Sequence, residues 1–334
     1  MADNHINYNQ GLQTLRFLAA LLVVAAHIAH YMRIYYPEIY FLGASIERWG
    51  TLGVDMFFVI SGYLMTKIQS EKCKSALVFF LDRILRIVPL YWALTIIYSF
   101  GLLILSKYNL SITDFSIEHL ISSMFFLSTF LMDKAPFITV GWSLEFEILF
   151  YFFFSISIIF FKDITFIALS TAIIIILFFI YFGGPWHLGF EFVIGMFLGI
   201  KKFRDMLFIL IALTTPFLYF LFAVGAYEVP RALYFGLPCA IVVYFVINYK
   251  SRQLYISTLG GFSYEIYLIQ VFILPILFKL IYWLIPDKLS MNMIAFFGLL
   301  FVVASGYLLS IIFSKSCDLF WQSLHKKIGL RNVE

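Results

Sequence analysis

Residues 15–32 read LRFLAALLVVAAHIAHYM, an apolar stretch long enough to cross a lipid bilayer as one helix. Similar blocks recur along the chain and are bounded by charged residues, glycine and proline. They are continuous blocks and not the alternating ten-residue pieces that form an outer-membrane barrel. This pattern predicts an all-α fold, a polytopic bundle of transmembrane helices.

The composition of the whole chain indicates the same class of protein. Of the 334 residues, 63% are hydrophobic and 13% are charged, whereas soluble domains carry about 25% charged residues. This excludes a soluble enzyme, a disordered protein and a nucleic-acid binder. The three cysteines show neither a CxxC pair nor metal-ligand spacing, so we expect no disulfide framework and no metal site.

Ten apolar blocks are candidate membrane spans. They cover residues 14–33, 50–69, 80–105, 140–161, 164–182, 187–201, 206–225, 231–248, 262–285 and 292–314. The stretch 117–132 is apolar but contains Glu118 and His119, and we interpret it as an interfacial or re-entrant piece. It belongs to the long outer loop 106–139, which is expected to cover the bundle from outside. The chain start lacks the features of a cleaved signal peptide, so the first block is expected to remain as a helix.

The basic residues predict the orientation of the bundle. Sixteen of the 23 lysines and arginines lie at the chain ends and in one set of alternate loops, and six lie in the opposite loops. Because cytoplasmic loops carry the excess of positive charge, both termini are expected in the cytoplasm, in agreement with an even number of spans. We expect one membrane domain over residues 11–315 and a cytoplasmic tail over residues 316–334.

Ionisable residues within a predicted span are costly and therefore indicate function. Arg16 and His27 are eleven residues apart, which is close to three helical turns, so they share one helix face. The rise between them is about 16 Å, which places Arg16 near the cytoplasmic surface and His27 deep in the membrane. A snorkelling arginine and a buried structural histidine are the alternative interpretation.

A pair of arginines begins the third span. Arg83 and Arg86 occupy positions i and i+3, so their guanidinium groups are neighbours on one helix face. Two forked cations at a cytoplasmic helix end suit a ligand that carries phosphate. Ordinary positive-inside anchoring is the alternative interpretation.

Acidic residues stand at the expected outer ends of two spans. Glu145 and Glu147 open the fourth span behind Trp142 and Ser143, and a spacing of two residues turns them to different faces. One is expected to face a cavity and the other a partner helix or the outer loop. Asp55 opens the second span, which is expected to bring it near the deep histidine of the first. Capping of a helix start is the alternative for these carboxylates.

Five sequence blocks resemble, in this order, those of the acyltransferase 3 family of integral-membrane acyltransferases. They are LQTLRFLAALLVVAAH, GVDMFFVISGYLM, the RxxR pair Arg83 and Arg86, VGWSLEFEILFY with the family's glutamate at Glu147, and GGFSYEIYLIQ. The resemblance covers about residues 11–315. There are two departures: Gln13 and Thr14 stand where the family often has Asp-Gly, and Gln270 replaces a late histidine and cannot act as a base.

The resemblance implies transfer of an acyl group, usually acetyl, from cytoplasmic acyl-CoA to a hydroxyl of a surface glycan or of its lipid-linked precursor. The glycan is expected to be O-antigen, capsule or exopolysaccharide. Acyl-CoA is then a co-substrate, no cofactor is bound permanently, and the location is the bacterial cytoplasmic membrane. Members with a fused SGNH domain are much longer, so the chemistry is expected within the membrane bundle.

The resemblance and the residue pattern together assign roles to the candidate site residues. Three are expected to be catalytic, with the histidine as general base or transient acyl carrier and the acids as its partners: His27, Glu147 and Asp55. Three are expected to bind the phosphates of acyl-CoA: Arg16, Arg83 and Arg86. Three are expected to support the acceptor or the fold: Trp142, Ser143 and Tyr267.

A proton-coupled small-solute transporter is the alternative from another class, because intramembrane acids and a histidine also form proton relays. The sequence shows neither an internal repeat nor paired helix breaks in two halves, which argues against a carrier. A flippase or scaffold without chemistry is the third alternative. Exchange of labelled acetyl-CoA in detergent would distinguish the enzyme, because a carrier needs a sealed vesicle.

Overall fold

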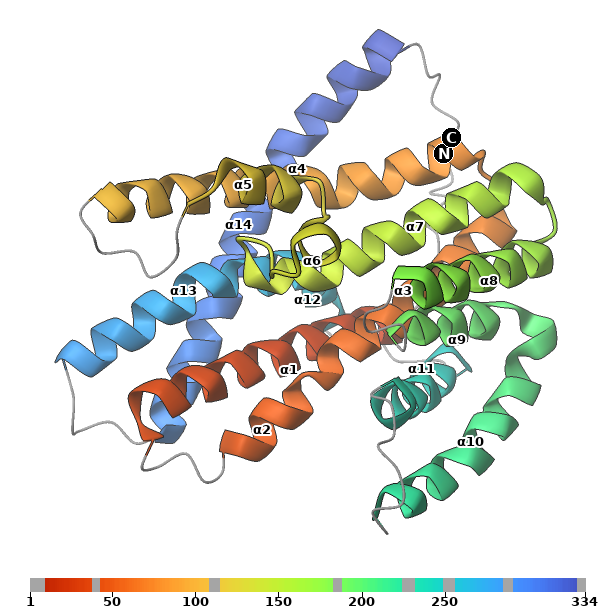
Figure 1. The fold of residues 1–334 in the computed structure, drawn as a ribbon, viewed down its shortest axis with the longest axis horizontal. Helices are drawn as coiled ribbons and strands as arrows, with labels where there is room; N and C mark the ends of the chain where they lie inside the picture. The colour runs from red at the N-terminus through yellow and green to blue at the C-terminus, as the bar shows by residue number, and fades with distance from the viewer. Residues whose placement is uncertain are drawn as a thin grey trace.

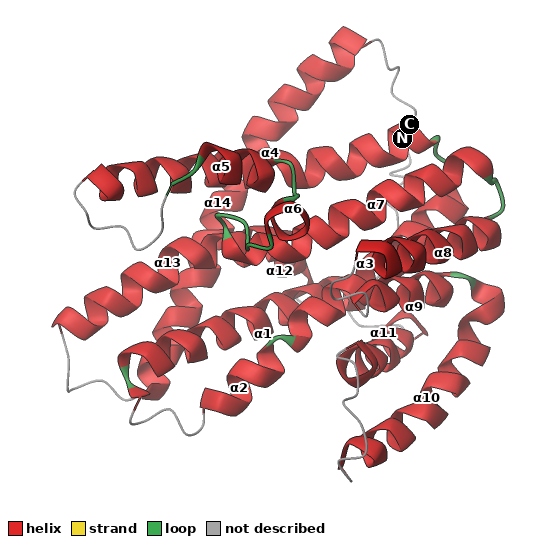
Figure 2. Ribbon diagram, in the orientation of Figure 1, coloured by secondary structure: helices red, strands yellow, loops and turns green. Residues whose placement is uncertain are grey.

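The structure of the chain is a computed structural model that describes residues 10–37, 43–107, 115–182, 188–223, 232–248, 256–284 and 291–328. Within these ranges the chain forms helices joined by short turns and contains no strand (Figures 1 and 2). The predicted all-α class is confirmed. Several residues that contributed to the predicted orientation, including Lys250, Arg252 and the chain ends 1–9 and 329–334, lie outside the described residues.

Each of the ten predicted spans coincides with a helix. These are α1 (Gln10–Tyr35), α3 (Leu52–Lys72), α4 (Ala76–Lys107), α7 (Trp142–Phe160), α8 (Ile164–Phe182), α9 (Gly189–Gly199), α10 (Lys201–Ala223), α11 (Leu237–Asn248), α13 (Ser263–Leu284) and α14 (Met291–Ile328). Five of them, α1, α4, α7, α13 and α14, are long and apolar enough to cross a membrane. The count of ten spans and the cytoplasmic position of the termini stay predictions.

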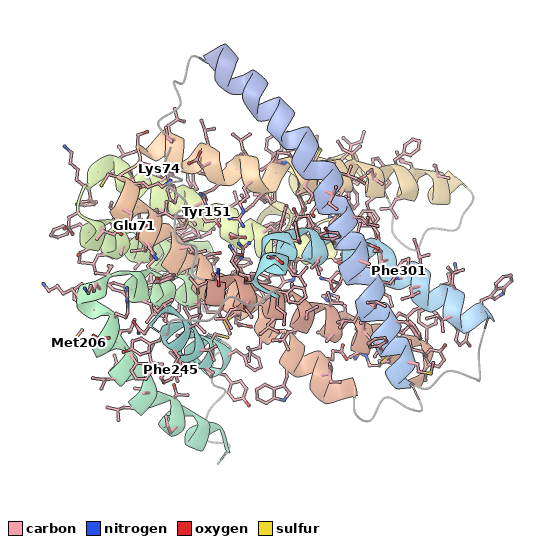
Figure 3. All side chains as sticks on the ribbon, turned by 180° about the vertical axis from the view of Figure 1, so that it is seen from behind. Glu71, Lys74, Tyr151, Met206, Phe245 and Phe301 are labelled. Atoms are coloured by element: carbon pink, nitrogen blue, oxygen red, sulfur yellow. The ribbon has the colours of Figure 1, made fainter. Side chains whose placement is uncertain are left out.

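The outside of the bundle is apolar, as a lipid-facing surface requires. Met206 on α10, Phe245 on α11 and Phe301 on α14 are each more than half exposed and project from their helices (Figure 3). Tyr181 and Trp283 are also exposed, and they lie at helix ends that are predicted to be outer. Aromatic residues at such positions are typical of the membrane–water interface. The chain is therefore a multi-helix membrane protein.

α1 and α3 form an antiparallel pair next to α2 (Gly43–Gly50). A Cβ added at Gly50 would lie 2.6 Å from Cβ of Ala26, and one added at Gly53 would lie 2.2 Å from the carbonyl oxygen of Ala19. Successive residues from Gly50 to Gly53 therefore contact earlier and earlier residues of α1, which shows that α1 and α3 run antiparallel. Glycine at these positions lets the two backbones approach closely. The first two predicted spans are expected to be antiparallel, and the structure agrees.

α3 and α9 pack in the same direction, which agrees with their places as the second and sixth predicted spans. A Cβ added at Gly195 would lie 2.1 Å from the carbonyl oxygen of Val59, and one at Gly199 would lie 2.8 Å from Cβ of Thr66. The two helices thus touch backbone to backbone over more than a turn. This contact, together with the aromatic core that α3, α4, α7 and α9 share, gives α3 a fixed position.

The stretch predicted to be interfacial or re-entrant contains α5 (Ile117–Met124) and α6 (Ser128–Met132). Trp92, in the middle of α4, donates a hydrogen bond from Nε1 to the carbonyl oxygen of Met124 at 2.7 Å. α5 exposes Ile117 and Ile121, whereas Ser123 on its other side is fully buried. Glu118 is exposed as well, so the outward side of α5 is mixed and does not distinguish lipid from the membrane interface. The hydrogen bond to Trp92 in the middle of α4 favours the re-entrant alternative.

α7 begins at the level of the middle of α4, and this corrects one expectation. A Cβ added at Gly141, the residue before α7, would lie 2.8 Å from the ring of Tyr91, next to Trp92. The sequence predicted that α7 opens at the outer end of a span. The segment with α5 and α6 instead carries the chain inward before α7 starts, so the acids at the start of α7 lie deeper than expected.

Candidate active site

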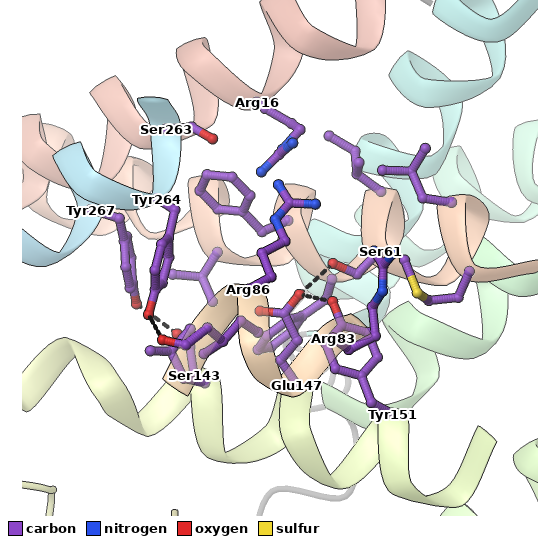
Figure 4. A pocket seen from close by; sticks show the side chains of 18 residues that line it. Arg16, Ser61, Arg83, Arg86, Ser143, Glu147, Tyr151, Ser263, Tyr264 and Tyr267 are labelled. Atoms are coloured by element: carbon purple, nitrogen blue, oxygen red, sulfur yellow. Dashed lines mark hydrogen bonds between the residues drawn. The ribbon is translucent and has the colours of Figure 1, made fainter. Parts of the chain in front are cut away.

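A pocket between α1, α3, α4, α7 and α13 gathers six of the nine predicted site residues (Figure 4). They are Arg16, Arg83, Arg86, Ser143, Glu147 and Tyr267. The remaining wall is largely apolar, with side chains such as Phe57, Leu64 and Leu144. The space between these side chains is about 750 Å³, including the part that is open to the outside. Mixed apolar and polar walls of this kind are typical of ligand sites.

The three arginines enter the pocket from two helices. Arg83 and Arg86, at positions i and i+3 of α4, share one helix face, and both line the pocket as predicted. Arg16 reaches it from the first half of α1. The structure shows no carboxylate within 4 Å of the Arg83 or Arg86 guanidinium among the described residues. Nε of Arg83 is buried without a hydrogen-bond partner.

This arrangement leaves an excess of positive charge. Three guanidinium groups and one carboxylate, that of Glu147, line the pocket. Arg86 is exposed and Arg83 is half-buried, so a ligand in the pocket can reach their guanidinium groups. The pocket therefore suits an anion, and the planar, forked geometry of arginine suits a phosphate in particular.

Glu147 is held by two hydroxyl groups. Ser61 Oγ on α3 donates a hydrogen bond to Glu147 Oε1 at 2.8 Å. The Tyr151 hydroxyl, one turn further along α7, donates to the same oxygen. Both residues line the pocket (Figure 4). The carboxylate is thus oriented from two sides, by α3 and by its own helix.

Glu145 has a different environment, as the spacing of two residues predicted. It is buried, and its two oxygens accept hydrogen bonds from the backbone N–H groups of Ser128 at 3.0 Å and Thr129 at 2.9 Å. These N–H groups begin α6, where the helix dipole favours a carboxylate. Glu145 therefore anchors the outer loop to α7, while Glu147 faces the cavity.

The start of α7 is tied to α13 by hydroxyl contacts. Ser143 Oγ and the Tyr267 hydroxyl are 2.7 Å apart, and the Tyr267 hydroxyl also donates to the carbonyl oxygen of Val140 at 2.8 Å. Ser143 and Tyr267 are both buried. Trp142 lies outside the pocket lining and packs edge-on against Phe146. These contacts agree with the expected supporting role of Ser143 and Tyr267.

His27 lies outside this pocket, further along the same helix as Arg16. Its Nδ1 lies 2.8 Å from the carbonyl oxygen of Val23. Because a carbonyl oxygen only accepts, Nδ1 carries the hydrogen, and the neutral ring keeps the lone pair of Nε2 for another proton. α1 is unbroken from Gln10 to Tyr35, so the predicted rise of about 16 Å between Arg16 and His27 is retained.

Asp55 does not lie at the level of His27, contrary to expectation. Gly53, two residues before it, packs against Ala19. Because α1 and α3 are antiparallel, Asp55 lies still lower, nearer to the level of Arg16 than to that of His27. The expectation rested on a two-helix hairpin, but α2 occupies the upper part of α1 and α3 begins only halfway down. Asp55 is fully buried and lies outside the pocket lining.

Sequence reasoning missed several residues of the pocket. Ser61 lies within the block GVDMFFVISGYLM but carries no charge, and Tyr151 is one of many aromatic residues on α7. The spacing of four between Glu147 and Tyr151 places both on one helix face and was the available signal. Tyr264, which donates to the carbonyl oxygen of Ile87 at 2.7 Å, was likewise not singled out.

Two comparisons with known proteins identify the family of the chain. Residues 9–314 match the family model described as "Acyltransferase domain", that of the acyltransferase 3 family. Over 105 residues the chain is 39% identical to the exopolysaccharide production protein ExoZ of Rhizobium meliloti (strain 1021). That match covers 30% of this chain and 32% of ExoZ, about a third of the relative's length. No solved structure matches the chain.

The family match extends over nearly all of the described helices, from α1 into α14. It includes every residue that lines the pocket, as well as His27 and Asp55. The arginine-lined pocket thus lies entirely within the part of the chain that the family model covers. The chain belongs to the acyltransferase 3 family.

Proposed function

We propose that this protein transfers an acyl group, most simply acetyl, from cytoplasmic acyl-CoA to a hydroxyl of exopolysaccharide or of its lipid-linked precursor. Acyl-CoA is supported as the donor by the pocket in which Arg83 and Arg86 have no carboxylate partner among the described residues. Exopolysaccharide is supported as the acceptor by the likeness to ExoZ, whose name refers to exopolysaccharide production.

The donor is proposed to bind with its phosphates at the arginines. Basic residues predict that the start of α1 and the start of α4 are cytoplasmic, and acyl-CoA is available on that side. The guanidinium groups then pair with the phosphates of the coenzyme. The apolar part of the wall, with Phe57 and Leu64, suits the pantetheine arm. The arm is comparable in length with the rise from Arg16 to His27.

His27 is proposed to be the general base at the other end of the arm. Its Nε2 takes the proton from the acceptor hydroxyl as the hydroxyl oxygen attacks the thioester carbonyl. The carbon–sulfur bond breaks, the new ester forms, and the proton passes to the departing thiolate of coenzyme A. A covalent route, in which the imidazole first carries the acyl group, uses the same residue.

The position of the carboxylates changes their proposed roles. Glu147 lies among the arginines, so we assign it to the donor end of the site and not to the histidine. Ser143 and Tyr267 hold α7 against α13 and keep this end of the pocket in shape. Asp55 is proposed to support α1 and α3 at the level of Arg16.

The proposed function is tested by nuclear magnetic resonance of the surface polysaccharide from cells with and without the protein. We expect acyl signals to disappear on deletion, to return with the wild-type chain, and not to return with His27→Ala, since the base is lost. Replacement of His119, which lies in α5 and bonds the carbonyl oxygen of Ala135, is the matched control and should restore acylation. Acylation by a membrane-inserted His27→Ala variant would contradict the role of His27, and unchanged polysaccharide on deletion would contradict the function.

A further inference from the structure

Ser61, like Ser143, differs from most serines of the apolar helices because its hydroxyl contacts a side chain of another helix. Ser99, Ser155 and Ser310 each donate to a carbonyl oxygen three or four residues earlier in their own helix. This local bond is the usual one for serine in a helix. Ser61 donates instead across the bundle, from α3 to Glu147 on α7 at 2.8 Å. Such a bond between helices fixes one side chain relative to another.

We propose that Ser61 is a positioning residue that keeps the Glu147 carboxylate away from the arginines, so that Arg83 and Arg86 remain available to the phosphates of the donor. The inference rests on the proposed function for the identity of the donor. Its geometric part concerns only the residues of the pocket and is independent of the donor.

Glu147 shares the pocket with the arginines, which carry the opposite charge. Glu147 is the only carboxylate among the described residues that line it, and Arg16, Arg83 and Arg86 line it with Glu147. A carboxylate and a guanidinium that share a pocket can form a strong bidentate pair. The structure shows no such pair for Arg83 or Arg86 within 4 Å among the described residues. Something therefore holds Glu147 back.

Two hydroxyl groups restrain the carboxylate of Glu147. Oε1 of Glu147 accepts from Ser61 and from Tyr151, so two hydroxyl groups satisfy the same oxygen. Tyr151 belongs to the helix of Glu147, so its bond fixes only the local conformation. Ser61 belongs to α3, and its bond fixes the carboxylate relative to another helix.

The Ser61 hydroxyl, which donates this hydrogen bond, lies in a rigid part of α3. Gly62 directly follows Ser61, and a Cβ added there would lie 2.1 Å from the carbonyl oxygen of Phe192 on α9. Backbone contact with α9 leaves α3 little freedom at this point. The Ser61 hydroxyl is therefore held by a rigid part of the bundle, as a positioning group must be.

The test is a double-mutant cycle on the purified full-length protein in detergent, with coenzyme A binding as the readout. Ser61→Ala is expected to weaken binding by about tenfold, the size of a lost hydrogen bond to a charged group. In a Glu147→Gln background the same substitution should change binding by less than about twofold, because the neutral amide does not compete for the arginines. Ser61→Thr keeps the hydroxyl and should bind like the wild type.

Two further measurements separate the possible failures. Ser155→Ala removes a buried hydroxyl that bonds only its own helix, and it should leave binding unchanged. Modification of Arg83 and Arg86 by phenylglyoxal, followed by mass spectrometry, needs no donor, and it should slow in Ser61→Ala as the arginines become paired. Equal losses of binding in both backgrounds, or unchanged arginine reactivity, would overturn the inference. If the wild type does not bind coenzyme A, the proposed donor is wrong. Slower arginine modification in Ser61→Ala would then still support the role of Ser61.

Discussion

Two glutamates that are separated by one residue have different hydrogen-bond partners in this protein. Glu145 accepts two backbone hydrogen bonds from the start of α6, and Glu147 accepts two hydroxyl bonds beside the arginines. The sequence predicted that the pair would split, because a helix turns by about 200° over two residues. Which glutamate faces the cavity was indicated by the family resemblance, and the structure places Glu147 there.

The arginine pair leads to a prediction at the same scale. Replacing Arg83 and Arg86 together by glutamine should weaken binding of acetyl-CoA more than binding of dephospho-acetyl-CoA, because the lost contacts fall on phosphate. A hydrogen bond to a charged group contributes about 1.5–3 kcal/mol, so a loss of tenfold or more in Kd is expected. Isothermal titration of the purified protein measures both ligands.

The matched control for this prediction removes two other basic residues. Lys201 and Lys202 at the start of α10 are exposed and do not line the pocket. Their replacement by glutamine lowers the net charge by the same amount and should leave the affinity nearly unchanged. Equal weakening of both ligands by the Arg83 and Arg86 replacement would contradict contact with the 3′-phosphate, the group that dephospho-acetyl-CoA lacks.

At the scale of the elements, the position of α7 depends on the segment before it. α5 and α6 bring the chain to the middle of α4, and α7 starts there beside Tyr91. The free backbone groups at the start of α6 are satisfied by Glu145, as irregular backbone within a membrane requires. Glu147 lines the same pocket as Arg83 and Arg86 because α7 begins at this depth.

The contact between α3 and α9 leads to a prediction about stability. Gly195→Ala should destabilise the protein, because the added Cβ would lie 2.1 Å from a backbone carbonyl oxygen of α3 that has no room to move. Overpacking of a tight core costs about 1–3 kcal/mol. The apparent Tm in detergent, measured by loss of monodisperse protein, should fall by several degrees. Gly101→Ala on α4 is the control, since nothing lies within 4 Å of its added Cβ, and it should leave Tm unchanged or slightly raised. An unchanged Tm for Gly195→Ala would contradict the backbone contact.

At the scale of the whole molecule, the relative directions of packed helices agree with a chain that alternates across the membrane. α1 and α3 are antiparallel, and α3 and α9 are parallel, as their places in the predicted order require. The predicted orientation then puts the arginine pocket toward the cytoplasm.

Cys73 allows the orientation to be tested. It is exposed in the turn between α3 and α4, and it is a free thiol, whereas Cys239 is free and buried. In cells that express a Cys317→Ser variant, a membrane-impermeant maleimide should label Cys73 only after permeabilisation. A further variant with Lys134→Cys, an exposed outer-loop position, should be labelled in intact cells. Labelling of Cys73 in intact cells would reverse the predicted orientation.

The sequence by itself determined the class of the protein, the approximate places of the long helices and a short list of ionisable residues within them as candidates for function. Apolar blocks and their charged boundaries are local properties, and the cost of charge in lipid makes each exception visible. It also determined that Arg83 and Arg86 share a face, since helical spacing decides this.

Only the tertiary structure decided which of these residues meet. Depth in the bundle depends on where each helix begins relative to its neighbours, and three short helices, α2, α5 and α6, shift these starts. As a result Asp55 lies below His27, and Glu147 lies among the arginines. Ser61 carries no charge and forms its decisive bond with a residue 86 positions away, so its part in the site depends on packing between α3 and α7 that no local pattern contains.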